Sequence, residues 1–250
     1  MLIVPQNLTE PERIAANLER IRDRIRTAAE QSGRTVDQIT LVGASKGRAA
    51  PAIAAAHAAG LSDLGENYVQ DALPKMAELA RSAPAAAAGI TWHFIGALQA
   101  NKTRAVAENF AWVHTVERLR IAERLSAQRP FHAPALNVCV QVHIGGEASK
   151  AGAEPAQVPQ LLRAIGALPR LKLRGLMCLP PPEAAAERQR YWLHQLLELF
   201  ESVNADGAGL DTLSMGMSAD LEAAVQEGAT LVRIGTDLFG PRPPKAADPA

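Results

Sequence analysis

The fold is decided by the stretch Ile39-Thr40-Leu41-Val42-Gly43-Ala44-Ser45-Lys46-Gly47. Its apolar, β-branched first half predicts a buried strand, and Lys46 stands where that strand ends. Apolar surroundings disfavour a charged amine, so they lower its pKa and leave more of it as a free-base nucleophile. Such an amine forms imines with aldehydes. The alternative is a surface lysine that only follows a strand.

Composition limits the classes of protein to consider. The chain has 250 residues, 48% of them hydrophobic, which is enough for one large core, either one barrel or two small domains. Lys and Arg total 26, as do Asp and Glu, so no net field favours nucleic acid or an anionic membrane as a partner. Cys139 and Cys178 lie in strand-like runs, which indicates buried thiols of a reducing compartment.

The two ends of the sequence predict little chemistry. The first five residues have no basic flank and too short an apolar run for a signal peptide. No apolar run is long enough to span a bilayer, so we expect a soluble, cytoplasmic protein. Residues 243–250 are rich in proline and alanine and predict a disordered tail after a single domain at 1–242.

Helix-like and strand-like segments alternate along the chain. Thr9-Glu10-Pro11-Glu12 predicts a capping box, and Ile14, Leu18, Ile21 and Ile25 follow at helical spacing up to a stop at Gly33. Seven more strands are expected after the lysine strand, at 61–65, 91–96, 111–116, 136–144, 171–179, 210–214 and 231–234. Helices are expected near 52–59, 69–80, 118–127 and 183–203, and 82–89 is interpreted as a connector.

This count of alternating elements predicts an α/β fold, a single (β/α)8 TIM barrel with an additional N-terminal helix. A doubly wound open sheet is the alternative. It often carries a glycine-rich first turn, and Gly43-Ala44-Ser45-Lys46-Gly47 does not match that pattern.

Small and hydroxyl residues follow the last two predicted strands. In barrels, the loops after strands seven and eight frequently bind phosphate, because small residues let backbone N–H groups approach the oxygens. Ser214, Ser218, Gly235 and Thr236 supply these residues, with Ser218 as the expected N-cap of a helix beginning near Asp220. Separately, each is explained by a cap or a turn; together, opposite Lys46, they favour a phosphate site.

Arg233 lies within the eighth predicted strand, and alternation directs it away from Val232 and Ile234. An arginine inside a barrel needs an acceptor. A structural salt bridge is one interpretation; the other is a hydrogen bond to an aromatic nitrogen of a cofactor. A pyridoxal ring held in that way would be a weak electron sink. His93, His114 and His143 lack metal-like spacing and are interpreted as hydrogen-bonded core residues.

Several motifs in order resemble the YggS/PROSC family of pyridoxal phosphate homeostasis proteins over nearly the whole chain. They are Ala44-Ser45-Lys46, Gly65-Glu66-Asn67-Tyr68-Val69-Gln70, Trp92-His93-Phe94-Ile95-Gly96, Leu213-Ser214-Met215-Gly216-Met217-Ser218 and Arg233-Ile234-Gly235-Thr236. The resemblance implies a barrel like the N-terminal domain of alanine racemase, carrying pyridoxal 5'-phosphate (PLP).

By this resemblance, Lys46 is the Schiff-base lysine and Arg233 faces the pyridine nitrogen. Ser214, Ser218, Gly235 and Thr236 would surround the phosphate, Asn67 would lie near the ring, and Lys150 would lie near the mouth. The chain departs from the family pattern at Gly47-Arg48, where a threonine and another polar residue are usual.

The resemblance implies a monomeric carrier that binds, buffers and supplies PLP, with PLP-dependent apoenzymes as partners. A low-activity amino-acid racemase and a lysine-dependent aldolase on a sugar phosphate are the alternatives. A racemase of this fold uses a tyrosine from a second domain, for which we expect no room after the eighth strand. Tyr68 and Tyr191 are the two tyrosines of the sequence.

Overall fold

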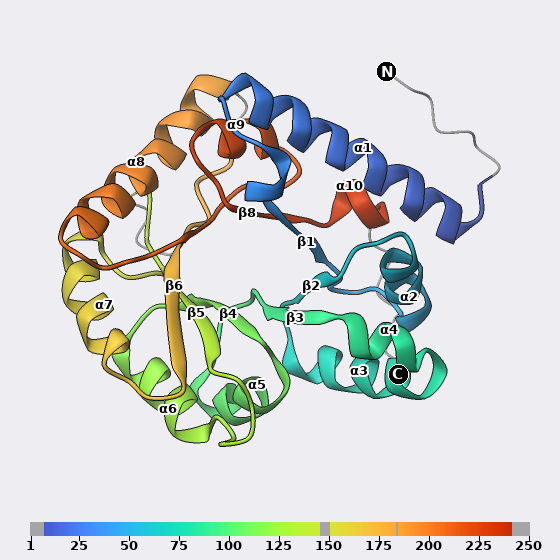
Figure 1. The fold of residues 1–250 in the computed structure, drawn as a ribbon, viewed down its shortest axis with the longest axis horizontal. Coiled ribbons are helices and arrows are strands. Elements are labelled where there is room, and N and C mark those ends of the chain that lie inside the picture. The colour runs from blue at the N-terminus through green and yellow to red at the C-terminus, as the bar shows by residue number, and fades with distance from the viewer. Residues whose placement is uncertain (1–7, 146–150, 184, 242–250) are drawn as a thin grey trace, which may run out of the picture.

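The computed structural model describes residues 8–145, 151–183 and 185–241. Eight parallel strands close into a barrel in chain order, and the helices form a ring outside it (Figure 1). Closure comes from pairing of the first strand with the last, with Val42 opposite Arg233. The predicted (β/α)8 barrel is confirmed, and the open doubly wound sheet is excluded.

The strands are short and start close to their predicted positions. They are β1 (Thr40–Ala44), β2 (Asp63–Glu66), β3 (Thr91–Phe94), β4 (Trp112–Val116), β5 (Leu136–Gln141), β6 (Leu171–Met177), β7 (Thr212–Ser214) and β8 (Leu231–Ile234). Since every strand runs in the same direction, their carboxyl ends meet at one end of the barrel, where barrels of this class place their functional residues.

Helices connect the strands along the chain, with the first before β1 and the last after β8. They are α1 (Glu10–Gln31), α2 (Ala50–Ala58), α3 (Val69–Ser82), α4 (Pro84–Gly89), α5 (Thr103–Asn109), α6 (Leu119–Gln128), α7 (Val158–Gly166), α8 (Ala186–Ala205), α9 (Leu221–Gln226) and α10 (Thr236–Phe239). Three short 3₁₀ turns are η1 (Val36–Gln38), η2 (Ala100–Lys102) and η3 (Pro155–Gln157).

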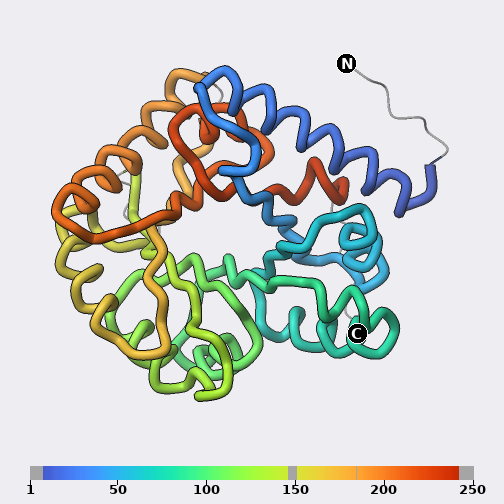
Figure 2. The backbone as a smooth tube through the Cα atoms, viewed as in Figure 1, coloured from blue at the N-terminus to red at the C-terminus, as the bar shows by residue number. Residues whose placement is uncertain are grey.

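Helix α1 is the additional element before the barrel, as predicted. The backbone N–H of Thr9 donates to the Glu12 carboxylate at 2.9 Å, which completes the expected capping box. Gly33 follows the helix with φ of +69°, a left-handed conformation that favours glycine. The helix packs against α2, α9 and α10, so it joins the beginning of the chain to its last two helices (Figure 2).

The segment interpreted as a connector at 82–89 is largely a helix, α4, and the connector prediction was wrong there. Pro84 occupies the first turn, where its missing N–H costs nothing, and the alanines that follow have high helix propensity. The segment has too few polar residues to show the polar face of a helix, although the intrinsic propensity of its residues favours one.

Strand β5 ends three residues earlier than expected. Beyond Gln141 the chain pairs instead with a later segment, because the His143 N–H donates to the Ala153 carbonyl and the Ala153 N–H donates to Gln141. Strand β6 likewise ends at Met177, two residues before the predicted end, and three prolines at 180–182 follow with no N–H to donate. Irregular segments after β5 and β6 therefore form this part of the barrel mouth.

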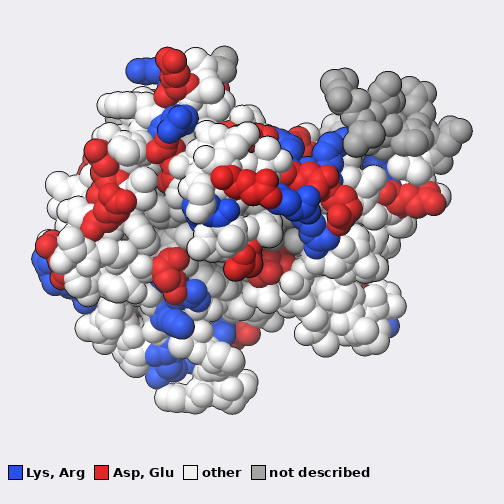
Figure 3. Space-filling view, turned by 45° about the horizontal axis from the view of Figure 1, so that its top comes forward, with Lys and Arg blue, Asp and Glu red and all other residues white. Residues whose placement is uncertain are grey.

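Charges of both signs are interspersed over the molecular face in Figure 3, and neither sign forms a continuous surface there. This agrees with the zero formal net charge. No described helix combines the length and hydropathy needed to cross a membrane. Cys139 and Cys178 are buried free thiols, as the sequence predicts, and burial raises the pKa of each to about 12.

Candidate functional site

Lys46 lies in the turn directly after β1 and is half-buried. Gly47 follows it with φ of +72°, which a glycine adopts without steric cost. The N–H of Ser45 donates to the Gly65 carbonyl at 2.9 Å, so the turn is fastened to β2. The lysine stands at the strand end, as predicted.

A buried ion pair lies behind this turn. Oε1 of Glu66 accepts hydrogen bonds from Lys75 Nζ at 2.6 Å and from Ser45 Oγ at 2.5 Å. Lys75 Nζ also donates to the Ser45 carbonyl at 3.1 Å. The residue before Lys46 is therefore held through both its side chain and its backbone.

This ion pair was not predicted from the sequence, although the position of Lys75 in the sequence indicates it. Lys75 lies on the same face of α3 as Ala72 and Leu79, both fully buried. A lysine at apolar helical spacing must meet a buried partner, because an unpaired charge in a core is very costly.

The loops after β7 and β8 lie together at the same end of the barrel as Lys46. Ser218 Oγ accepts a hydrogen bond from the Asp237 N–H at 3.4 Å, which joins the two loops. A Cβ on Gly235 would lie 3.3 Å from the carbonyl oxygen of Ala44, two residues before Lys46. The lysine and the small hydroxyl residues thus surround the same side of the mouth.

Ser218 is not the N-cap of the following helix, contrary to the sequence interpretation. Helix α9 begins at Leu221 with Asp220 in the N-cap position. The Asp220 carboxylate accepts from the Met217 N–H at 2.6 Å and closes the turn in between. This leaves the Ser218 hydroxyl directed toward the start of α10.

Arg24 of helix α1 holds both loops from outside. Its guanidinium donates to the Ser218 carbonyl at 3.1 Å and forms ion pairs with Asp237 and Glu222, each at 2.6 Å. The hydrogen bond to Glu222 raises the pKa of Arg24. The additional helix therefore contributes directly to the shape of the predicted phosphate loops.

We expect Arg24→Ala to weaken anion binding at these loops by about three- to tenfold and to lower the free energy of unfolding by ~1 kcal/mol, because a partly exposed network of two ion pairs and a hydrogen bond to the backbone loses its centre. Affinity by titration and urea unfolding measure the two effects. Arg26→Ala is the matched control, since Arg26 pairs only locally with Asp23 among the described residues and its side chain is 51% exposed. Equal results for the two variants would contradict the role of Arg24.

Arg233 points into the barrel, as alternation predicts, and is 4% exposed. Its Nη1 donates to Ser214 Oγ at 2.6 Å and its Nη2 to the Cys178 carbonyl at 3.0 Å. Burial lowers the pKa of the guanidinium. No carboxylate in the described part of the chain forms an ion pair with it, so the structural salt bridge considered above is not what holds this arginine. Ser214 itself is fully buried.

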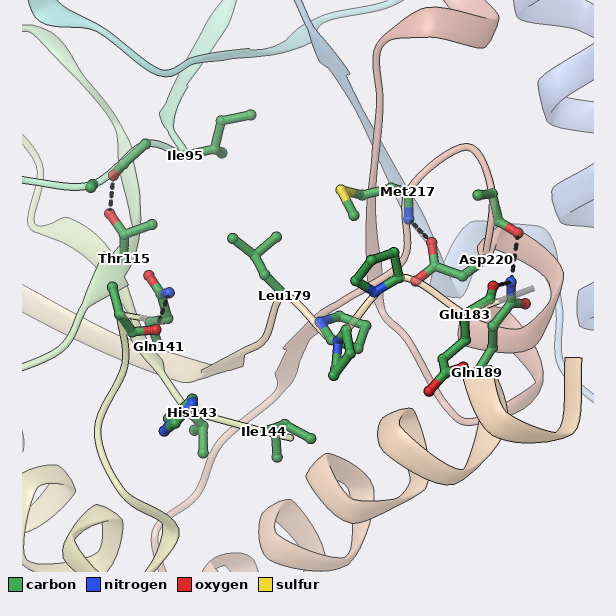
Figure 4. Close-up of a pocket in the computed structure, with 18 of the residues that line it drawn as sticks. Ile95, Thr115, Gln141, His143, Ile144, Leu179, Glu183, Gln189, Met217 and Asp220 are labelled. Atoms are coloured by element: carbon green, nitrogen blue, oxygen red, sulfur yellow. Dashed lines mark hydrogen bonds between the residues drawn. The ribbon is translucent and has the colours of Figure 1, made fainter. Parts of the chain in front are cut away.

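A cavity of about 560 Å³ opens at the carboxyl ends of the strands. Among its lining residues, Thr115 and His143 lie on one side, Met217 and Asp220 on the other, and the apolar side chain of Leu179 lies between them (Figure 4). Met217 and Asp220 flank Ser218, so the cavity adjoins the loop after β7. Burial raises the pKa of the Asp220 carboxyl at this wall.

Asn67 is the one predicted cofactor residue among the described residues that line this cavity. Its Oδ1 is buried and has no hydrogen-bond partner in the described structure. A Cβ on Gly96 would come within 2.1 Å of the Asn67 carbonyl oxygen, so a glycine is needed for the observed approach. A buried acceptor without a partner is costly, and a ligand that donates a hydrogen bond here would remove that cost.

Lys150, the remaining predicted site residue, lies outside the described residues. Within the described chain, no group of three or more His, Cys, Asp or Glu could hold a metal ion.

Comparison with known proteins gives concordant results. The model of the alanine racemase N-terminal domain family matches residues 14–243. A pyridoxal phosphate homeostasis protein of Pseudomonas aeruginosa is 54% identical over 229 residues, covering 92% of this chain and 96% of that protein. Its Escherichia coli counterpart is 47% identical, covering 92% and 97%. The structure of PipY from Synechococcus elongatus with PLP bound is 35% identical, with a TM-score of 0.75, covering 88% of this chain and all of PipY.

Proposed function

We propose a function for this chain from the family to which it belongs, that of the pyridoxal phosphate homeostasis proteins. The chain binds PLP, buffers it and supplies it. The observation that carries the proposal is that Lys46 lies beside the loops after β7 and β8, in a fold similar to that of a relative whose structure has PLP bound.

The residues present fit this cofactor in three respects. Lys46 offers a half-buried amine for the aldehyde carbon. Arg233 offers a permanent donor to a ring nitrogen, and the unpartnered Asn67 Oδ1 offers an acceptor to a donating ring substituent. Ser218, Gly235 and Thr236 offer hydroxyls and approachable backbone for a phosphate.

Each side chain has a separate task in this proposal. When bound, PLP supplies the aldehyde that takes up a primary amine. Lys46 provides that amine and fixes the ligand covalently, while Ser45, Glu66 and Lys75 fix the turn that carries it. Arg233 donates to the pyridine nitrogen without giving up its proton, and so keeps the ring a weak electron sink.

Racemase activity is less well supported than a role as a carrier of PLP. Tyr68 is 56% exposed and Tyr191, on α8, is 49% exposed, and neither is among the described residues lining the cavity. The cavity therefore shows no tyrosine acid or base within the described chain. The relatives are named as homeostasis proteins, and neither racemase nor aldolase is favoured by those names.

We extend the proposal to the setting of the protein. It acts as a cytoplasmic monomer and delivers PLP to dependent apoenzymes, with Lys150, which lies outside the described residues, as the receiving or relaying amine. Its barrel domain extends over residues 1–242, followed by a tail at 243–250 that lies outside the described residues.

Borohydride reduction tests the central assignment. The protein incubated with PLP is expected to show a visible absorption band that reduction removes, and peptide mass analysis is expected to place the added mass on Lys46. Protein that remains colourless with excess PLP would refute both the carrier and the racemase. Release of α-deuterium from amino acids into water would favour the racemase.

The double variant Ser218→Ala, Thr236→Ala tests the phosphate assignment. We expect PLP affinity to fall by roughly 10–100-fold, because two donors to a charged group are lost. The lysine remains able to react, so pyridoxal without a phosphate should bind as it does to the unmodified protein. Titration of the absorption band with each ligand measures both.

The matched control is Ser62→Ala with Thr91→Ala, which removes the same two hydroxyl types at the opposite end of the barrel. It is expected to leave PLP affinity unchanged. If the two double variants bind PLP equally well, the phosphate lies elsewhere.

A further inference from the structure

A line of hydrogen bonds crosses the inside of the barrel from Asp63, at the start of β2, to Arg233 on β8. His93 Nε2 lies 3.0 Å from Asp63 Oδ1, and His93 Nδ1 lies 2.9 Å from His114 Nε2. His114 Nδ1 lies 2.7 Å from Ser214 Oγ, the atom that also accepts from Arg233 Nη1. All but Asp63 are at least 96% buried, so the bonds among His93, His114, Ser214 and Arg233 have no competition from solvent. The bond from His93 to Asp63 is part-buried.

The direction of every bond follows from the carboxylate at one end. An ionised Asp63 only accepts, so a neutral His93 carries its proton on Nε2 and accepts at Nδ1. His114 must then donate from Nε2 and accept at Nδ1. Ser214 donates its hydroxyl proton to His114, and its oxygen accepts from Arg233. His93, His114 and Ser214 thus each donate one hydrogen bond and accept one.

Both imidazoles are neutral in this arrangement, and burial lowers the pKa of each, well below its ordinary value for His114. A charged His93 would instead donate from Nδ1 to His114 Nε2, and His114 would then donate from Nδ1 to Ser214 Oγ. These two bonds would run in the opposite direction. Ser214 Oγ would then face donors from both His114 and Arg233, and its own proton would need another acceptor. The two protonation states therefore differ in where the imidazole protons lie.

The line gives Arg233 a buried acceptor without placing a carboxylate beside it. Hydrogen bonds that all point one way polarise one another, so the Asp63 charge strengthens the acceptor at Ser214 from a distance. The guanidinium is held through Ser214 and the Cys178 carbonyl, which use two of its five N–H donors. The hydroxyl proton of Ser214 is used within the line and is unavailable to a phosphate.

We propose that His114 and His93 are positioning residues for the ring-nitrogen end of the cofactor site, and that Ser214 serves Arg233 and donates no hydrogen bond to the phosphate. This inference rests on the proposed function, because it assigns these residues to the PLP site. From the sequence, Ser214 was placed around the phosphate together with Ser218 and Thr236. The present proposal gives Ser214 a different role from these two residues.

The histidine protons can be observed directly in the protein without PLP. In long-range ¹⁵N–¹H spectra of ¹⁵N-histidine-labelled protein at neutral pH, His93 and His114 are expected to be neutral, with the proton on Nε2. Spectra of His114→Leu and His93→Gln identify the two signals. A proton on Nδ1 of His114, or a doubly protonated ring at either position, would overturn the proposal.

The second test measures the ring nitrogen itself. With ¹⁵N-labelled PLP, His114→Leu is expected to shift the pyridine nitrogen resonance and to weaken PLP binding about tenfold. Ser214→Ala, a smaller change, carries the same expectation if His114→Leu does not fold. Val113→Ala on the same strand removes core packing alone and is expected to leave the resonance in place.

An unshifted resonance with unchanged affinity in His114→Leu or Ser214→Ala would overturn the positioning role. Failure of the unmodified protein to take up PLP would instead refute the proposed function, and the histidine spectra would still decide the line of hydrogen bonds.

Discussion

Replacing Lys46 by alanine is expected to leave the protein colourless in the presence of PLP and to weaken PLP binding roughly 100-fold or more, equivalent to ~3 kcal/mol. The covalent link is lost, and only hydrogen bonds from Arg233, Asn67 and the phosphate loops remain to hold the ligand. The free energy of unfolding should change little, by about 0.5 kcal/mol, because Lys46 is half-buried in a turn. Absorbance titration and urea unfolding measure the two effects.

Lys172→Ala is the control for the loss of a lysine. Lys172 is exposed on β6, near the end of the barrel opposite the mouth, and its removal should affect neither quantity. Two results would count against Lys46: a visible band that survives in Lys46→Ala, or a borohydride-reduced adduct found on another lysine of the unmodified protein. Either result would move the amine elsewhere at the mouth.

The barrel could be predicted from the sequence because its signals are local. The capping box at Thr9, the β-branched runs and the residues that end them are each contained in a few neighbouring positions. The ends of the strands were less predictable. Strand β5 stops at Gln141 because the residues after it pair with Ala153, and no local pattern specifies such a pairing.

The same distinction applies to the site. The position of Lys46 at a strand end and the inward direction of Arg233 could be predicted, because strand ends and alternation are local properties. The hydrogen bonds of Ser214 could not, because its partners lie 100 residues before it, at His114, and 19 after it, at Arg233. Ser218 was assigned to a helix cap by composition, but Asp220 occupies that position once the turn after Gly216 is formed.

The remaining departure from the family pattern, Gly47-Arg48, now has a structural context. Gly47 adopts a left-handed turn, and Arg48 donates to the carbonyls of Gly240 and Pro241 after α10. Arg48 therefore ties the lysine turn to the end of the barrel domain. The departure changes how the turn is fastened and leaves the lysine at the strand end.

Lys75→Met is expected to produce the largest loss of stability among these variants, about 3–5 kcal/mol, because it leaves the buried Glu66 carboxylate without its cation. In a chain of this size that lowers the melting temperature by roughly 10 °C. Glu66 Oε2 already lacks a partner in the described structure, so no second donor is in place to compensate. The variant should also slow formation of the visible band with PLP, because Ser45, in the turn carrying Lys46, loses the bond from Lys75 to its carbonyl. The Glu66 carboxylate that accepts from Ser45 Oγ also loses its cation.

The double variant Glu66→Gln, Lys75→Met distinguishes the cost of an uncompensated buried charge from the cost of altered packing. Removing both charges should restore most of the lost stability, because the main cost of the single variant is an uncompensated buried charge and not a missing attraction. Arg104→Ala breaks an exposed ion pair with Glu108 at 3.6 Å and should change stability by no more than ~0.5 kcal/mol. If Lys75→Met were as mild as Arg104→Ala, the carboxylate would have to be protonated or hydrated in the folded protein, and the pair could not be what holds the lysine turn.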